Sequence, residues 1–295
     1  VAPGPIFNGT TRLVDLDPPA GTQAALINLT YASTAGPGFL RAWGPRAARP
    51  PTSSVNADQA GAVVANAAVV PLDADGGFLI ESSLTGRVVV DVMAWLSDSG
   101  GASDDGRFVT LPPARLVDTR IPEGTTLTSG SPNPWTRDGD QIDFVAEGNL
   151  GIPDDGDAAA IVVSIAALGG SEPGGWLGGF PGGSTWSGTS NVNVLQNGIR
   201  ANMLMIPTGS AGFSSLQTQS VDDVVIDVLG YVTSAAAPTS GSGLYSSIDP
   251  IRVVDSRIPL GFGPLAPGEV STVAIPNGSA AAAVVQNVTL SLIHI

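Results

Sequence analysis

The chain has 295 residues, of which 43% are hydrophobic, and this is enough for about two domains with buried cores. Its 12 basic residues are all arginine against 26 acidic ones, so the net charge is −14; cysteine and lysine are absent, and the single histidine is His294. This composition excludes thiol nucleophiles, disulfides and multi-histidine or thiolate metal sites. It also argues against a Ser-His-Asp triad, against nucleic acid and against anionic membrane surfaces as partners.

Segments along the chain predict neither export signal nor membrane insertion. The N-terminal residues VAPGPIF have no charged region followed by an apolar one, so no signal peptide is visible. The longest largely apolar run spans 158–168 and contains a single serine, Ser164. A transmembrane helix needs about twenty such residues, so we expect no membrane insertion.

The chain repeats itself with a period of about 137 residues, which is the size of a whole domain. Three pairs of segments carry the repeat: Ser54–Gly61 with Asn191–Gly198, Asp91–Leu96 with Asp227–Val232, and Arg115–Pro122 with Arg252–Pro259. We expect a first repeat over 1–97 without its opening segment, a complete second repeat over 105–234, and a third over 245–295 without its end. The incomplete repeats are expected to be less ordered, or to borrow strands, because an open sheet edge pairs with any available strand.

The pattern within each repeat is typical of β-strands. Short β-branched runs bounded by glycine, proline, serine or asparagine occur at Val88–Trp95, Ala160–Ile165, Asp223–Leu229 and Val284–Leu290. Turn clusters arrive about every ten residues, and no long stretch carries an apolar stripe of helical period. We therefore predict an all-β chain of tandem β-sandwich-like domains. The segment Arg12–Leu16 is similar in sequence to the start of the Arg115–Pro122 segment. By its position within the repeat, however, it aligns better with Gln141–Val145.

Five segments together resemble a repeat module found in secreted, multi-modular actinobacterial proteins. They are Pro113–Arg120, Ala159–Ser164, Gly175–Leu177, Ser190–Asn193 and Asp227–Tyr231. The resemblance implies an extracellular or cell-surface accessory module, often beside wall hydrolases or adhesin-like regions. It brings no catalytic residues with it.

A recurring Asp-x-Arg pair is the first candidate for a special role. In a strand, Asp118 and Arg120 would lie on one face, within reach of each other, and Asp255 and Arg257 repeat the pair. The simpler interpretation is a structural ion pair that holds the opening strand to its sheet. The alternative is a site for an anionic or sugar ligand.

Clustered aromatic residues in a glycine-rich segment form the candidate ligand site. Trp176, Phe180 and Trp186, with Asn191 and Asn193 nearby, could stack and hydrogen-bond a glycan, with Trp176 and Phe180 as one platform. Phe39 and Trp43 show the same spacing in the first repeat. The alternative is that these rings pack in the core.

Acidic turns and scarce glutamates leave two weaker alternatives open. Loops such as Asp73/Asp75 and Asp138/Asp140/Asp143 could hold a calcium ion, although none completes a known calcium motif; no other cofactor is expected.

We predict a non-enzymatic extracellular repeat module for surface display, spacing or attachment, with a polysaccharide or cell-wall glycan and neighbouring repeats as partners. The alternatives are a purely structural stalk and a glycoside hydrolase-like enzyme with a carboxylate pair.

Overall fold

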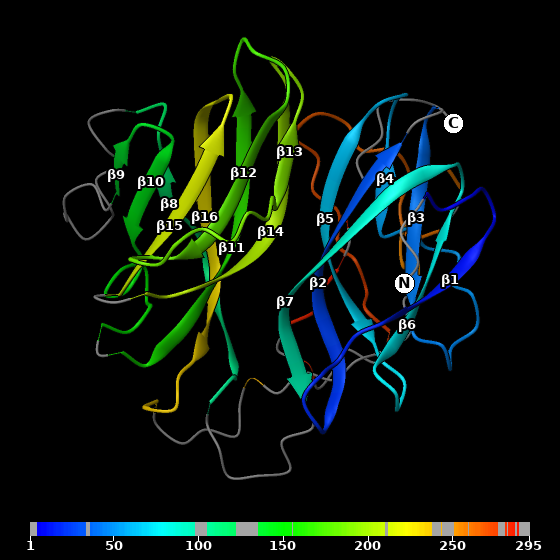
Figure 1. The fold of residues 1–295 in the computed structure, drawn as a ribbon, viewed down its shortest axis with the longest axis horizontal. Helices are drawn as coiled ribbons and strands as arrows, with labels where there is room; N and C mark the ends of the chain where they lie inside the picture. Colours follow the sequence, from blue (N-terminus) through cyan, green and yellow to red (C-terminus); the bar gives the residue numbers. More distant parts are fainter. Residues whose placement is uncertain are drawn as a thin grey trace.

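The structure, a computed structural model, describes residues 5–33, 36–97, 105–121, 135–154, 156–209, 212–237, 243, 251–258, 260–276, 281, 283–286 and 288. The regular elements in these residues are all β-strands, arranged in four antiparallel sheets that form two sandwiches side by side (Figure 1). The predicted all-β, sandwich-like fold is therefore confirmed. The described residues contain no helix that is long and apolar enough to cross a membrane.

The first sandwich packs a four-stranded sheet against a three-stranded one. In sheet order, the strands are β1 (Thr11–Asp15), β6 (Gly77–Ser82), β3 (Gly38–Trp43) and β4 (Val55–Ala57), facing β5 (Val63–Pro71), β2 (Thr22–Ser33) and β7 (Gly86–Ser97). Alternate residues of β2 and β6 point inward, and the core includes the fully buried Leu29, Tyr31 and Phe78. Because successive side chains of a strand point to opposite faces of the sheet, the apolar residues on the inward face form this core.

The second sandwich adds one strand to each sheet. Its sheets are β13 (Val192–Val194), β12 (Gly175–Pro181), β15 (Phe213–Gln219), β10 (Gln141–Val145) and β9 (Trp135–Asp138), facing β14 (Ile199–Pro207), β11 (Ala158–Gly169), β16 (Val221–Thr233) and β8 (Phe108–Asp118). Ile161, Ile165 and Leu177 are among its fully buried core residues.

The two sandwiches share one strand order. The order β1-β6-β3-β4 matches β10-β15-β12-β13, and β5-β2-β7 matches β14-β11-β16. The central strands even carry an irregularity at the same place, between Leu26 and Ile27 in β2 and between Val162 and Val163 in β11. Because β1 takes the place of β10, the segment around Arg12 corresponds to Gln141–Val145, in agreement with the sequence alignment.

The sandwiches differ at one sheet edge. Strand β16 lies between β11 and β8, whereas β7 pairs with β2 and, on its other side, makes only a single bridge, from Gly86 to Ile6, among the residues that the structure describes. The inward residues of β16 are fully buried, but their counterparts on β7 are more exposed, and Val92 reaches 39%. Among the described residues, the first sandwich thus has no counterpart of β8, and the edge of β7 is open beyond Gly86.

The segment predicted to begin a third repeat forms no strand in its described residues. Asp255 makes a single isolated bridge to Leu260, and the predicted strand over 284–290 is not present in its described residues, 284–286 and 288. The backbone N–H and C=O groups of a strand need hydrogen-bond partners on a neighbouring strand, and none of the described residues provides such a strand for this segment. The segment instead lies against the first sandwich, where Arg252 Nη2 donates to the Pro51 carbonyl at 3.0 Å (Figure 1).

Buried asparagines join the two sandwiches. Strands β13 and β14 of the second sandwich pack against β5, the neighbour of β2, and Asn28 on β2 is fully buried. Asn202 Nδ2 donates to Asn28 Oδ1 at 3.1 Å and to the Asn191 carbonyl at 2.8 Å, and Asn202 Oδ1 accepts from Ala67 N at 2.8 Å. Asn28 Nδ2 in turn donates to the Ser190 carbonyl. These bonds tie β2 and β5 of one sandwich to the edge of the other.

Candidate functional site: an aromatic sheet face of the second sandwich

The candidate site lies on the outer face of the sheet that contains β12 and β15. Leu177 points into the core and is fully buried, so its neighbours Trp176 and Gly178 face outward. Trp176 lies opposite Gln219 of β15 and Asn193 of β13 in the register. Aromatic and amide side chains therefore gather on one face of this sheet.

Two tryptophans stack on this face. The ring centroids of Trp176 and Trp186 are 4.7 Å apart, with an interplanar angle of 14°. Each indole N–H is held, because Trp176 Nε1 donates to Gln219 Oε1 and Trp186 Nε1 donates to the Thr189 carbonyl, both at 3.0 Å. Both side chains remain partly exposed. The pair is thus a preformed, oriented aromatic surface.

Gly178 makes room for this stack. A Cβ at this position would stand 2.8 Å from Trp186 Nε1 and would also collide with the Thr189 carbonyl. The loop between β12 and β13 can therefore fold down onto the sheet only because residue 178 has no side chain. The glycine-rich composition that was noted in the sequence has a specific steric function at this residue.

Amide groups border the stacked rings. Asn193 accepts from Ser190 Oγ at 3.3 Å through Oδ1. Its Nδ2 is buried and has no hydrogen-bond partner among the described residues. Gln219, paired with Trp176, lies at the exposed end of β15. The rings thus have polar groups beside them, as a sugar-binding surface requires.

The structure places the five predicted glycan residues in different environments. Trp176 and Trp186 lie together, and Asn193 is next to Trp176. Phe180 is only 5% exposed, and Asn191 is buried, with its Oδ1 accepting from Gly179 N at 2.8 Å. The predicted platform of Trp176 and Phe180 is therefore wrong, because the Trp186 loop covers Gly178, which separates those two residues on β12.

The same face of the first sandwich is built differently. Phe39 occupies the position of Trp176, but Arg41 stands where the second sandwich has Gly178, and its guanidinium carbon lies 5.1 Å from the centre of the Phe39 ring. Trp43, the counterpart of Phe180, is buried. The spacing shared by Phe39 and Trp43 therefore does not produce a second aromatic surface.

Arg41 belongs to an ion-pair cluster that sequence reasoning missed. Glu81 is buried and bonded to Arg41 Nη1 at 3.4 Å and to both Nε and Nη2 of Arg49. The Arg49 hydrogen bonds lower the pKa of Glu81, and burial lowers the pKa of Arg41. These residues lie on β3, on β6 and in a loop, so that only the antiparallel register of β3 and β6 brings two of them together.

The Asp-x-Arg pairs form ion pairs, but with a geometry other than the predicted one. Strand β8 ends at Asp118, and Arg120 lies in the turn that follows, where its Nε and Nη2 donate to the two oxygens of Asp118 at 2.8 and 2.6 Å. Arg115 Nη1 adds a third bond at 2.8 Å, and Arg115 Nε donates to Asp227 of β16. Since Asp118 is 1% exposed, it holds the end of β8 and offers nothing to a ligand.

The second pair repeats this arrangement without a strand. Asp255 accepts from Arg257 Nε at 2.9 Å and Nη2 at 2.8 Å, and from Arg252 Nη1 at 2.9 Å. The Arg257 hydrogen bonds lower the pKa of Asp255. The motif is therefore a local turn that forms from its own three charged residues.

These carboxylates make stability depend on pH. The pKa values of Glu81, Asp118 and Asp255 are lowered, mainly by hydrogen bonds from Arg49, Arg120 and Arg257, respectively. The unfolded chain binds protons near pH 4, where the folded carboxylates stay ionised, so this stabilisation is present above about pH 4 and is lost below it. Asp91 has the opposite effect on the pH dependence of stability, because burial raises its pKa.

We expect the melting temperature to fall as the pH is lowered from about 5 to about 2.5, because three lowered pKa values outweigh one raised value. Calorimetry at a series of pH values measures this dependence. Glu81→Gln should flatten the profile, since it removes one of the three groups. A melting temperature that rises on acidification would show that Asp91 dominates and would contradict the assignment.

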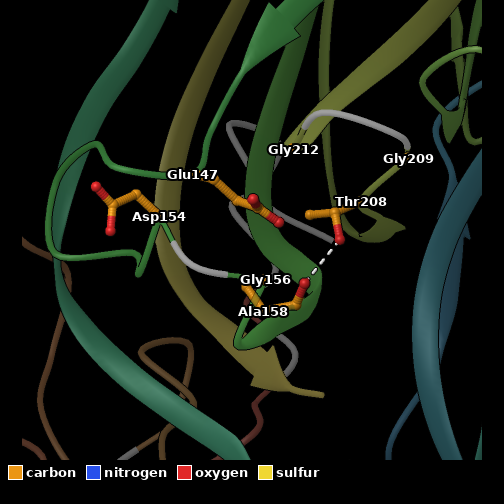
Figure 2. A pocket seen from close by; sticks show the side chains of 7 residues that line it. All are labelled: Glu147, Asp154, Gly156, Ala158, Thr208, Gly209 and Gly212. Atoms are coloured by element: carbon orange, nitrogen blue, oxygen red, sulfur yellow. Dashed lines mark hydrogen bonds between the residues drawn. The ribbon is translucent and has the colours of Figure 1, made fainter. Parts of the chain in front are cut away.

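A depression at one end of the second sandwich is the candidate for the enzymatic alternative. It has a volume of about 410 Å³ and is lined by Glu147, Asp154, Gly156, Ala158, Thr208, Gly209 and Gly212. Figure 2 shows the carboxylates of Glu147 and Asp154 pointing in different directions, while Thr208 Oγ1 donates to the Ala158 carbonyl at 2.7 Å. The described residues contain no group of three or more acidic or histidine side chains arranged to hold a metal ion. Two carboxylates, those of Glu147 and Asp154, therefore border this depression, and they do not point toward each other.

Comparisons with known proteins add only weak similarities. No protein-family model matches the chain, and no curated protein matches it. Among solved structures, the extracellular domain of ANXUR1 from Arabidopsis thaliana is similar over 76% of this chain and 82% of its own, at 10% identity and a TM-score of 0.22. The 11S allergen from Cocos nucifera is similar over 73% and 78%, at 12% identity and a TM-score of 0.17. Scores this low carry no argument about function.

Proposed function

We propose that the protein is a non-enzymatic extracellular module for surface display, spacing or attachment, and that its second sandwich binds polysaccharide. The observation that supports this most directly is the stacked Trp176–Trp186 pair on a sheet face bordered by amide side chains. Flat, oriented aromatic rings with adjacent hydrogen-bonding groups suit the apolar face and the hydroxyl rim of a sugar ring.

The geometry suits weak binding. One face of each indole is used in the stack, so that a sugar ring would lie on a remaining exposed face. By analogy with aromatic pairs, such a contact contributes about 0.5–1.5 kcal/mol. Binding to a long polysaccharide would then depend on many copies acting together, because linked weak sites gain affinity from their effective concentration.

Trp176→Ala is expected to weaken polysaccharide binding by roughly threefold to tenfold, which corresponds to the loss of one aromatic contact. A glycan array with the full chain selects the ligand, and titration followed by tryptophan fluorescence measures the change in Kd. Phe39→Ala, at the equivalent position of the first sandwich, is the matched control and should leave binding unchanged. Unchanged binding by the Trp176 variant would contradict the site.

Gly178→Ala tests the same site without removing a ring. The added methyl group should displace the Trp186 loop and separate the two indoles, with a loss of binding similar to that of Trp176→Ala. Gly263→Ala serves as the control, because a Cβ at that position meets no atom within 4 Å.

A structural stalk is the second candidate, and the asparagine contacts between the sandwiches favour it. A joint with buried hydrogen bonds at Asn28 and Asn202 holds consecutive sandwiches in one orientation, as a spacer requires. If no glycan on the array binds the intact chain, the stalk is the better account.

A further inference from the structure

The edge of β7 that faces away from β2 carries no added strand beyond Gly86 among the described residues. In the second sandwich the corresponding strand, β16, is covered by β8 through seven register pairs, among them Val225 with Asp118, Ile226 with Val117 and Asp227 with Arg115. In the first sandwich, Val89, Val92 and Trp95 of β7 are 53%, 39% and 37% exposed. An edge strand with exposed apolar side chains accepts an added strand readily.

The edge carries a charge that an added strand would neutralise. Asp227 of β16 is paired with Arg115 of β8, and Asp91 is its counterpart on β7. Asp91 accepts only one long hydrogen bond from Asn28 Nδ2, at 3.4 Å, among the bonds of the described residues, and burial raises its pKa. An arginine from an added strand would give this carboxylate the partner that Asp227 has.

The chain itself contains a segment of the right sequence. Arg252-Val-Val-Asp255-Ser-Arg257 matches Arg115-Leu-Val-Asp118-Thr-Arg120 position by position, including the turn in which Asp255 accepts from both arginines. Within one molecule this segment lies against Pro51, in the loop that joins β3 and β4 of the sheet opposite β7. In this arrangement the segment does not pair with β7 of its own molecule, so a second molecule would supply it.

We propose that the Ile251–Arg257 segment of a second copy of this chain adds to the edge of β7 and completes the first sandwich. Transferring the register of β8 on β16 places Asp255 opposite Val89, Val254 opposite Val90 and Arg252 opposite Asp91. Ser256 then takes the place of Thr119, which hydrogen-bonds the backbone N–H of Val224 at 2.8 Å; on β7 the equivalent residue is Val88. The copies would associate by strand addition, either reciprocally or as a chain.

Engineered cysteines test both the partner and the register, since the chain has no cysteine of its own. Val90→Cys in a tagged copy and Val254→Cys in an untagged copy would be mixed and mildly oxidised. Side chains opposite each other on adjacent strands have Cβ atoms about 5 Å apart, so a disulfide-linked dimer is expected. Val253→Cys in place of Val254→Cys is the control, because the neighbouring residue points to the other face and should cross-link at least tenfold less.

Charge reversal supplies the second arm. Arg252→Glu should lower the cross-linking yield, and Asp91→Arg in the partner copy should restore it, which a purely structural effect of either substitution would not do. Three results would overturn the proposal: equal yields from Val253 and Val254 variants, a chain carrying both cysteines that cross-links only within itself, or a mixture that sediments as monomer and stays reduced.

Discussion

Asp118→Ala is expected to lower the free energy of unfolding of the second sandwich by about 2 kcal/mol. Its carboxylate is buried and receives bonds from Arg120, Arg115 and the Arg120 backbone, all of which the substitution removes. The loss stays below the 3–5 kcal/mol that is typical of a fully buried pair, because both arginines reach solvent and Arg115 keeps Asp227.

Calorimetry of the full chain measures this change as a lower melting temperature. Asp58→Ala is the matched control, since the Asp58–Arg200 pair is exposed on both sides and is worth about 0–1 kcal/mol. Equal effects of the two substitutions would mean that Asp118 does not hold the end of β8. Glycan binding should survive Asp118→Ala, because the stacked tryptophans lie on the other sheet.

Asn202→Ala is expected to cost about 3 kcal/mol or more and to uncouple the two sandwiches. The side chain is buried, and its removal deprives the backbone N–H groups of Ala67 and Met203 of an acceptor and the Asn191 carbonyl of a donor. Each polar group that is left buried without a partner costs about 1–3 kcal/mol.

Calorimetry should then show two separate transitions where the native protein has coupled ones. Asn66→Ala provides the control, because Asn66 holds the same position in the first sandwich and donates to the Ser54 carbonyl within it. A single unchanged transition after Asn202→Ala would show that this asparagine does not couple the sandwiches.

The fold was accessible from the sequence because its signals are local. Alternating β-branched runs predicted the strands that became β7, β11 and β16, and the repeat of Asp91 at Asp227 gave the correspondence between the sandwiches. The Asp118–Arg120 contact was also accessible, since the two residues are close in the chain. Its turn geometry was not, because the end of a strand depends on the hydrogen bonds of the sheet around it.

Contacts between distant segments account for what the sequence did not reveal. The Trp176–Trp186 stack requires a loop to fold over Gly178, and the Arg41–Glu81 pair requires the register of β3 on β6. Phe180 appeared equivalent to Trp176 by strand alternation, yet it is buried by tertiary packing that alternation does not describe. The joint at Asn28 and Asn202 depends on how two domains meet, for which one sequence contains no local signal.

The open edge of β7 also has a consequence for the order in which the chain folds. During synthesis β8 emerges directly after β7, whereas β16, the strand that it pairs with in the structure, is completed more than a hundred residues later. N-terminal domains fold while the rest of the chain is still being made, at about 5–20 residues per second. For several seconds, then, β8 can pair with the edge of β7, while the similar edge of β16 has not yet been synthesised. It must leave any hairpin formed with β7 before the second sandwich closes, and native folding is a competition between a local pairing and a distant one.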